Sequence, residues 1–249
     1  CALPISPQQG FQLNLASNEL NLDNWLEFLG NHQRKHSAPN SNVNTNATNN
    51  IQISAQVKQL TLFDRIWQDL NLAVSNKNAI WQIRLRGSPQ IAGNIQFQSA
   101  NQSEANGLVS GRLARLKIPD ALASPATPAK AAQKIQTSKS PIEPSSIPSI
   151  DLVIDDLDWN KAQLGQAKIQ TKTNGNILNV DSIQFNNPQG NSTLTGRWVG
   201  GSQNASAHTN LNVALDIKDA GQIISHWTNQ KSVEGGRGKL NGTVEWDGS

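Results

Sequence analysis

Residues 81–85 read WQIRL and residues 91–97 read IAGNIQF, and in both stretches an apolar residue or a glycine occupies every second position. This alternation is typical of a β-strand with one apolar face, because successive side chains of a strand point to opposite sides of the sheet. The same spacing recurs along most of the chain and predicts about twelve strands. Other apolar sets with this spacing are Phe11, Leu13 and Leu15; Ile51, Ile53, Ala55 and Val57; Leu194, Gly196 and Trp198; Leu211, Val213, Leu215 and Ile217; and Leu240, Gly242, Val244 and Trp246.

Two stretches interrupt the strand pattern. Residues 30–50 consist mainly of Asn, Ser, Thr and Ala, and residues 119–148 are rich in Pro, Ala, Ser and Lys. Neither stretch has enough apolar residues to order itself around a core. We therefore expect a first strand-rich segment over residues 1–118 that contains the Asn-rich insertion, a disordered linker over 119–147, and a second strand-rich segment over 148–249.

Two short amphipathic helices are expected between the strands. Asp23 is the predicted N-cap of the first, and Asp219 is that of the second, where Gln222 completes a capping box. A strand thus leads twice into a capped helix, which hints at an internal repeat. The apolar stripes are Trp25, Leu26 and Leu29 in the first helix and Ile223, Ile224 and Trp227 in the second.

The composition narrows the classes of function. Charged residues make up 16% of the 249 residues and the formal net charge is +3, which is too small for a dedicated nucleic-acid surface. The single cysteine excludes an internal disulfide and a cysteine-based metal site. No apolar run approaches the length of about 18 residues that a membrane-spanning helix needs.

The chain contains no methionine, so we expect a fragment or a processed chain. The pair Cys1-Ala2 fits the start of a mature lipoprotein, but a clipped chain is the simpler explanation.

An acidic cluster is the first candidate for catalysis. Asp151, Asp155, Asp156 and Asp158 crowd one segment, and paired carboxylates can serve glycoside hydrolysis or metal binding. In a strand, however, Asp155 faces away from Asp156 and Asp158. We expect these residues to be surface acids.

The histidines are the second candidate. His32 and His36 have the spacing of two metal ligands on a helix, but they lie in a polar segment with cationic neighbours. His208 and His226 have no Ser or Cys motif beside them, and no Walker loop or dinucleotide fingerprint is present. We therefore predict that the protein is not an enzyme and that it holds no cofactor and no metal.

The strand pattern leaves an apolar face that must be covered, and two short helices are too few to cover about twelve strands. A second sheet could cover it, as in a β-sandwich. Alternatively, an open and strongly curved sheet could form an apolar trough that receives acyl chains. The pattern alone favours neither arrangement.

Several segments resemble the C-terminal AsmA-like region of the YhdP family. Residues 150–159, IDLVIDDLDW, followed by Leu164-Gly165, resemble the opening of that region. The resemblance covers most of the chain outside the two linkers, and its specificity lies in the order and spacing of Gly, Trp and apolar positions. Further matching segments are Trp81-Gln82-Ile83-Arg84-Leu85, residues 111–116, Ile118-Pro119, Thr195-Gly196-Arg197-Trp198, residues 211–217, Asp219-Ala220-Gly221, residues 235–240 and Val244-Glu245-Trp246.

This resemblance implies a mostly β fold, in which an extended, curved antiparallel sheet forms an open hydrophobic groove from repeated β-groove segments. It also implies a fragment of a much longer protein, tethered to the inner membrane of a diderm bacterium by a segment outside this sequence and extending through the periplasm. Members of the family are bridge-like carriers of phospholipids toward the outer membrane and support its integrity. The implied partners are phospholipid acyl chains, the remaining segments of the same chain and other envelope proteins, without nucleic acid.

The residues expected to line such a groove belong to the single-face apolar sets, for which an ordinary core is the alternative. They are Trp81, Ile83, Leu85, Ile91, Ile95, Phe97, Leu194, Trp198, Leu211, Val213, Leu215, Leu240, Val244 and Trp246.

A basic stretch accompanies the first half of the sequence. Residues 71–118 carry six basic residues against one acid, Glu104. Anionic lipid headgroups are expected to collect on such a surface, although a solvated basic face is the simpler explanation. The candidate headgroup contacts are Arg84, Arg86, Arg112 and Arg115.

Two functional classes remain. The first is a lipid-conducting segment, which predicts a wide, unfilled apolar groove. The second is an adhesion or carbohydrate-binding module built as a β-sandwich or solenoid, which predicts a filled core and a flat face with exposed Trp and Asn. We favour the first because of the resemblance.

Overall fold

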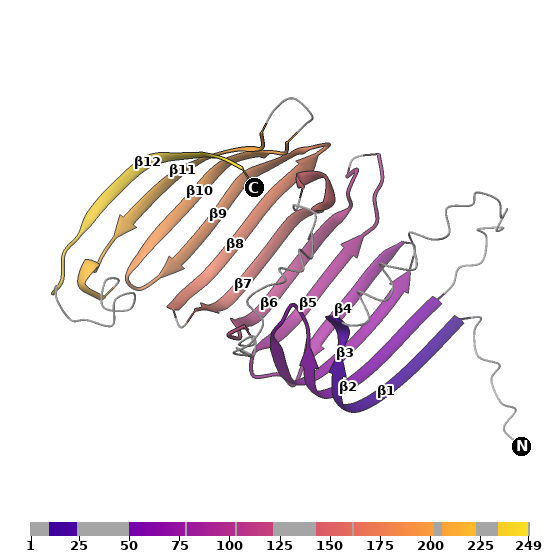
Figure 1. The fold of residues 1–249 in the computed structure, drawn as a ribbon. Coiled ribbons are helices and arrows are strands. Elements are labelled where there is room, and N and C mark those ends of the chain that lie inside the picture. The colour runs from indigo at the N-terminus through magenta and orange to yellow at the C-terminus, as the bar shows by residue number, and fades with distance from the viewer. Residues whose placement is uncertain are drawn as a thin grey trace, which may run out of the picture.

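The computed structural model describes residues 10–23, 50–77, 79–102, 104–121, 143–160, 162–201, 206–222 and 234–248. They form one sheet of twelve strands, whose order in space is their order along the chain (Figure 1). The strands are β1 (Gly10–Asn21), β2 (Asn50–Thr61), β3 (Ile66–Lys77), β4 (Ile80–Arg86), β5 (Ile91–Gln98), β6 (Leu108–Ile118), β7 (Ser149–Trp159), β8 (Ala162–Asn174), β9 (Ile177–Asn187), β10 (Gly190–Val199), β11 (His208–Ile217) and β12 (Gly238–Asp247).

The sheet is a single layer within the part of the chain that the structure describes. Every pair of strands in extensive contact is a pair of neighbours in the sheet. Besides the strands, the short 3-10 helix η1 (Pro144–Ser146) packs against β8 and β9. The expectation of a mostly β fold with one open sheet is confirmed, and the β-sandwich alternative is wrong.

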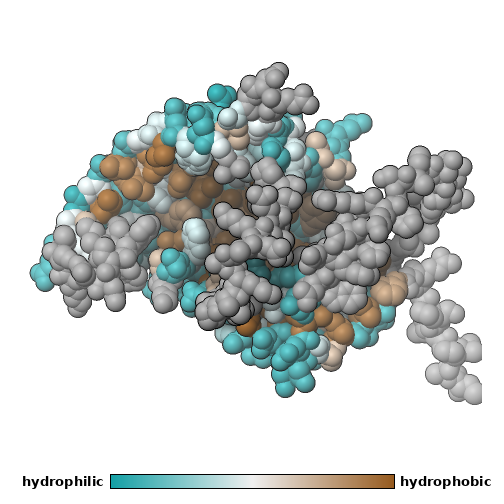
Figure 2. Space-filling view, in the orientation of Figure 1, coloured by the Kyte–Doolittle hydropathy of each residue, from teal (hydrophilic) through white to brown (hydrophobic). Residues whose placement is uncertain are grey.

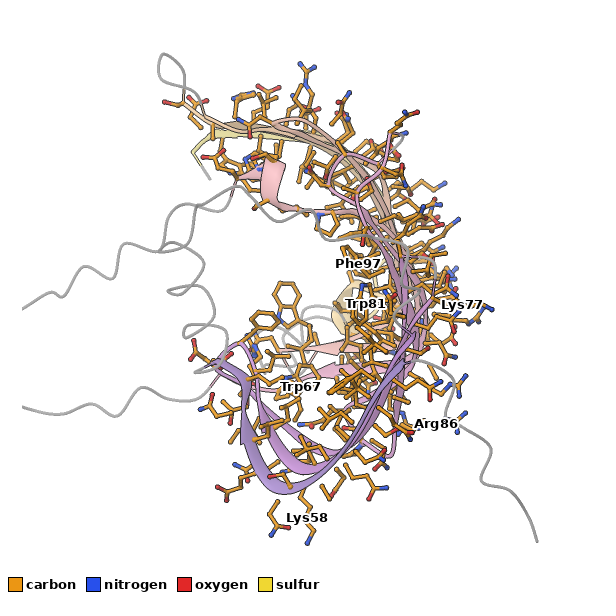
Figure 3. The ribbon with its side chains drawn as sticks, turned by 90° about the vertical axis from the view of Figure 1, so that its right-hand side faces the viewer. Lys58, Trp67, Lys77, Trp81, Arg86 and Phe97 are labelled. Carbon is orange, nitrogen blue, oxygen red and sulfur yellow. The ribbon has the colours of Figure 1, made fainter. Side chains whose placement is uncertain are left out.

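The sheet curves strongly, so that its cross-section resembles the letter C (Figure 3). Trp67, Trp81 and Phe97 lie on the concave side of the curve, whereas Lys77 and Arg86 lie on the convex side. The alternation along each strand therefore separates an apolar concave face from a polar convex face.

Glycines within the strands permit the bend. Gly93 in β5, Gly111 in β6 and Gly196 in β10 have φ angles of 145°, 153° and 154°, which side chains disfavour. A Cβ atom at Gly196 would overlap the carbonyl oxygen of Asn210 on the next strand. The pairing register also shifts beside Gly93 and beside Gly196, as in β-bulges, which bend a strand and increase its twist.

The sheet is not antiparallel throughout. β1 pairs with β2 and β6 pairs with β7 in parallel, while the other neighbours are antiparallel. Two parallel neighbours need a long connection, because the chain must return to the end at which the first strand began. The two long interruptions of the strand pattern fall between β1 and β2 and between β6 and β7. The sheet continues across both junctions.

The two predicted helix starts differ in outcome. The backbone N–H of Gln222 donates to Oδ1 of Asp219 at 3.0 Å, which confirms Asp219 as an N-cap. Asp23 is not an N-cap, because the helical turn already includes Leu22. The remainder of both predicted helices lies outside the described residues, and the described residues include no helix of the length and hydrophobicity that crossing a bilayer requires.

The carboxylate of Asp23 instead serves the turn between β2 and β3. It accepts hydrogen bonds from the backbone N–H groups of Phe63 at 2.7 Å and Asp64 at 2.9 Å. Both turn residues have positive φ, at 56° and 55°, a conformation that a bulky side chain adopts only when its surroundings hold it.

If glycines permit the bend, the effect of a glycine-to-alanine substitution on stability should depend on the position of the glycine. Gly196→Ala should lower the free energy of unfolding by about 2–3 kcal/mol, because the added Cβ meets backbone and φ becomes strained. Gly242→Ala on β12 is the matched control, since no atom lies within 4 Å of its Cβ position. Urea unfolding of both variants measures the difference, and equal effects would contradict a bend that depends on Gly196.

Candidate functional site

The strand register arranges the concave side chains in rows that run across the whole sheet. One row, which we name the central row, takes one residue from each strand, and every member is apolar or glycine. It comprises Leu13, Ile53, Val74, Ile83, Ile95, Gly111, Leu152, Ile169, Ile183, Leu194, Val213 and Gly242.

A row on each side of the central row widens the apolar face. The second row has Ser192 as its one polar residue, and the third row has Asn76 and Thr171. The second row is Leu15, Ala55, Leu72, Leu85, Gly93, Leu113, Ile154, Ala167, Phe185, Ser192, Leu215 and Leu240. The third row is Phe11, Ile51, Asn76, Trp81, Phe97, Val109, Ile150, Thr171, Val180, Gly196, Leu211 and Val244.

Burial along this face depends on the strand. In the middle of the sheet Leu113 and Ile154 are 2% exposed, because the tight curve packs concave side chains against one another. On the end strands the same rows are open: Phe11 is 57% exposed on β1, and Leu240 is 55% exposed on β12. Figure 2 shows hydrophobic residues gathered in the hollow of the sheet and hydrophilic residues around its margins. The site is thus a trough that is open at both ends of the described sheet.

The structure places every predicted lining residue on the concave face. Ile91 lies opposite Leu116 and packs against the buried cluster, and Trp198 and Trp246 flank Thr209 in a further row. The members in the three named rows are Ile83, Ile95, Leu194 and Val213; Leu85, Leu215 and Leu240; and Trp81, Phe97, Leu211 and Val244. Their contact with lipid remains a prediction.

The residues predicted to line the groove did not include the concave residues of β1–β3 and β6–β9. Leu72 and Val74 on β3, and Leu152 and Ile154 on β7, show the same two-residue spacing and could have been included. On β7 the signal is weaker, because Val153 is apolar and yet lies on the convex face opposite Arg112.

The candidate headgroup arginines lie on the convex face. Arg84 and Arg86 alternate with Ile83 and Leu85, so the sheet separates them from the apolar rows. On this convex face they border a shallow depression of about 450 Å³, which is also lined by Asn14, Ser54, Ala73 and neighbouring residues. This placement removes them from the rim of the trough, where a headgroup would lie if its acyl chains occupied the concave rows.

Arg112 is engaged in an ion pair across the parallel junction of β6 and β7. Its guanidinium donates to both carboxylate oxygens of Asp155, at 2.9 and 2.7 Å. The hydrogen bond from Arg112 and its charge hold the pKa of Asp155 below its usual value, against an opposing effect of desolvation. Lys117 forms a second connection, at 3.0 Å from Asp158 and 3.8 Å from Asp156. Most of the acidic cluster therefore joins the two halves of the sheet.

The described residues contain no group of three or more His, Cys, Asp or Glu placed to hold a metal ion. His208 contacts Asp247 at 2.8 Å between β11 and β12. His32, His36 and His226 lie outside the described residues.

Comparison with known protein families gives a match over nearly the whole chain. The family model described as YhdP protein matches residues 2–249. No curated protein and no solved structure matches the chain.

The β6–β7 ion pair predicts a pH-dependent difference between variants. Asp155 has a depressed pKa in the folded state, so its stabilising effect is present above its unfolded pKa and is lost as the pH falls through the folded value. Asp155→Asn should therefore lower the thermal midpoint slightly at pH 7, and the gap to wild type should close between about pH 5 and pH 2.

Asp151→Asn is the control, because Asp151 lies on the same strand and has no ion pair among the described residues. It should follow wild type at neutral pH. A gap at Asp155 that persists unchanged at low pH would show that the charge of this residue is not what joins the strands.

Proposed function

The chain belongs to the YhdP family, and from this membership and the continuous apolar trough we propose that it is a segment of a bridge-like protein that carries phospholipids. Lipid acyl chains occupy the concave face and move along it, while the headgroups stay in water. In this proposal the chain has no catalytic role.

The central row is the observation that carries the proposal. It crosses all twelve strands without a polar side chain. At about 4.8 Å between strands, it extends over roughly 53 Å, more than three times the hydrocarbon thickness of about 15 Å in one bilayer leaflet. The trough is therefore long enough to hold the chains of several lipids in succession.

Uniform chemistry along the central row favours movement. Each methylene that leaves water gains about 0.8 kcal/mol, so acyl chains stay on an apolar surface rather than in solvent. Moving one strand further along the central row exchanges one apolar contact for another, and no polar side chain in that row raises a barrier. The transfer between positions should accordingly be close to neutral in free energy.

The open side of the C-shaped cross-section accommodates the headgroup. Figure 3 shows that the strands curve into a C, whose concave face is turned toward the gap between their two ends. A headgroup at that opening keeps its hydration, which avoids the large cost of burying a charge. An enclosed barrel of the same lining would not offer this arrangement.

From the family we further propose where the protein works in the cell. The chain works in the periplasm of a diderm bacterium, tethered to the inner membrane through a segment outside this sequence, and carries phospholipid between the inner and outer membranes to support outer-membrane integrity. Its partners in this setting are the remaining segments of the same long chain and other envelope proteins.

A paired substitution tests the trough. Purified full chain should carry phospholipid in native mass spectrometry with lipid extraction, and Val213→Asp with Val244→Asp should reduce the bound lipid at least about tenfold, because two charges enter the apolar rows. The variant should stay folded, since Val244 is 51% exposed on an end strand.

The matched control is Ala214→Asp with Thr243→Asp, which places two carboxylates on the convex face of the same strands in the same diagonal relation. This control should retain its lipid. Equal lipid on the concave variant, or a wild type that takes up no lipid from phospholipid vesicles, would contradict the proposal.

A further inference from the structure

On β8 and β10, buried hydrogen-bond donors on the apolar face lack partners within the described part of the chain. Thr171 and Thr173 on β8 are 8% and 3% exposed, and their hydroxyl groups have no hydrogen-bond partner among the described residues. The indole Nε1 of Trp198 on β10 is also buried without a partner. We name these three side chains the donor cluster.

The register brings the donor cluster together on the concave side. Thr171 and Thr173 lie two residues apart on one strand, so they share a face at a spacing of about 7 Å. Thr173 pairs with Leu178, which pairs with Trp198, so Thr173 and Trp198 lie in one row, two strands or about 10 Å apart. The helix η1 packs against β8 and β9, and its Pro144 is fully buried.

Apolar side chains flank Thr171 and lie between Thr173 and Trp198, and Thr209 lies on the other side of Trp198. In the third row Thr171 lies between Ile150 and Val180, and Leu178 separates Thr173 from Trp198. A buried donor without an acceptor destabilises a protein, and native structures contain few of them. A ligand that supplies acceptors on this face would satisfy all three.

The position of the donor cluster favours a ligand whose hydrogen-bond acceptor lies between its apolar and its polar part. Thr173 and Trp198 are each the last residue but one of their strands. They therefore lie at the margin of the trough where β8 and β10 end, which we call this edge. A lipid whose chains extend inward over the central row would place its linkage region at this edge and its headgroup in the water beyond it.

The charges near the donor cluster favour an uncharged acceptor over an anionic one. The donor cluster contains no cation, and Glu143 approaches Gly200, two residues beyond Trp198. Phosphate and carboxylate groups are commonly bound by Arg or Lys, and a neighbouring carboxylate repels them. An uncharged carbonyl oxygen fits hydroxyl and indole donors without these requirements.

We propose that the donor cluster binds the ester carbonyl groups of a glycerolipid whose acyl chains lie in the trough. The inference rests on the proposed function, since it takes the lipid in the trough as given. Thr171, Thr173 and Trp198 thereby select ester-linked lipids and hold each one at a fixed depth as it passes this edge.

The test compares two probes that differ only at the linkage. Delipidated full chain is titrated with an ester-linked phosphatidylglycerol and with its diether analogue, which has the same chains and headgroup but no carbonyl oxygens. Wild type should bind the ester about tenfold more tightly than the ether, as expected for one to two net hydrogen bonds. Thr171→Val with Thr173→Val should remove most of the tenfold preference, because only the indole of Trp198 remains as a donor, and should leave ether affinity unchanged.

Controls separate this inference from the proposed function. Thr195→Val replaces a convex threonine on β10 and should leave the tenfold preference intact. If wild type binds neither probe, the proposed function fails. If it binds both equally, or if the valine pair keeps the preference, trough binding stands and the donor cluster assignment is overturned.

A spectroscopic readout covers the case of a variant that fails to fold. The valine pair should fold with an unchanged or raised thermal midpoint, because an unpartnered buried hydroxyl is replaced by a methyl group of similar shape. In wild type, the indole ¹⁵N–¹H resonance of Trp198, assigned by Trp198→Phe, should shift downfield with the ester and not with the ether. Identical shifts with both probes would overturn the assignment without any threonine variant.

Discussion

The register of the central row is the constraint on which the rest of the structure depends. Each of the twelve strands contributes one apolar residue or glycine to it. A slip of one residue between any two strands would turn the polar set of one strand onto the concave face, because side chains alternate with a period of two. On β4, such a slip would replace Ile83 by Arg84 or Gln82. Register is therefore specified by burial on one face, even though the described residues form no second layer over the sheet.

Curvature makes a single layer sufficient. Because Gly93, Gly111 and Gly196 let the strands bend, concave side chains in the middle of the sheet bury one another. The end strands lack a neighbour on one side, and their concave residues remain exposed, as Phe11 and Leu240 are. Exposed apolar strand edges pair readily with other chains, and β1 and β12 are the two exposed edges of the described sheet. The same bend that stabilises the sheet thus creates the trough.

The sequence predicted the strands and their apolar faces but not the way in which the sheet is closed or covered. Alternation at Trp81, Ile83 and Leu85 indicates a one-faced strand, and it equally fits a sandwich and a trough. The distinction depends on backbone conformation at glycines such as Gly196, which spacing does not reveal. Residue spacing also did not reveal the two parallel junctions, or the ion pair of Asp155 with Arg112 across one of them.

For the candidate site, alternation alone places Arg84 on the face opposite to that of Ile83. This placement argues against a headgroup contact of Arg84 beside the lining residues. The threonines at positions 171 and 173 continue the alternation with a polar residue, a signal that becomes informative only when the donors are seen to lack partners.

The central claim is that the concave face is a lipid path and the convex face is not. Photo-crosslinking in the cells that make this protein tests it most directly, with p-benzoyl-phenylalanine placed at Phe97 or at Gln96. These neighbours on β5 lie on opposite faces, since Phe97 faces the concave side and Gln96 is exposed on the other. The account predicts a phospholipid adduct at position 97 and none at position 96. Adducts of equal yield at both positions, or at position 96 alone, would contradict it.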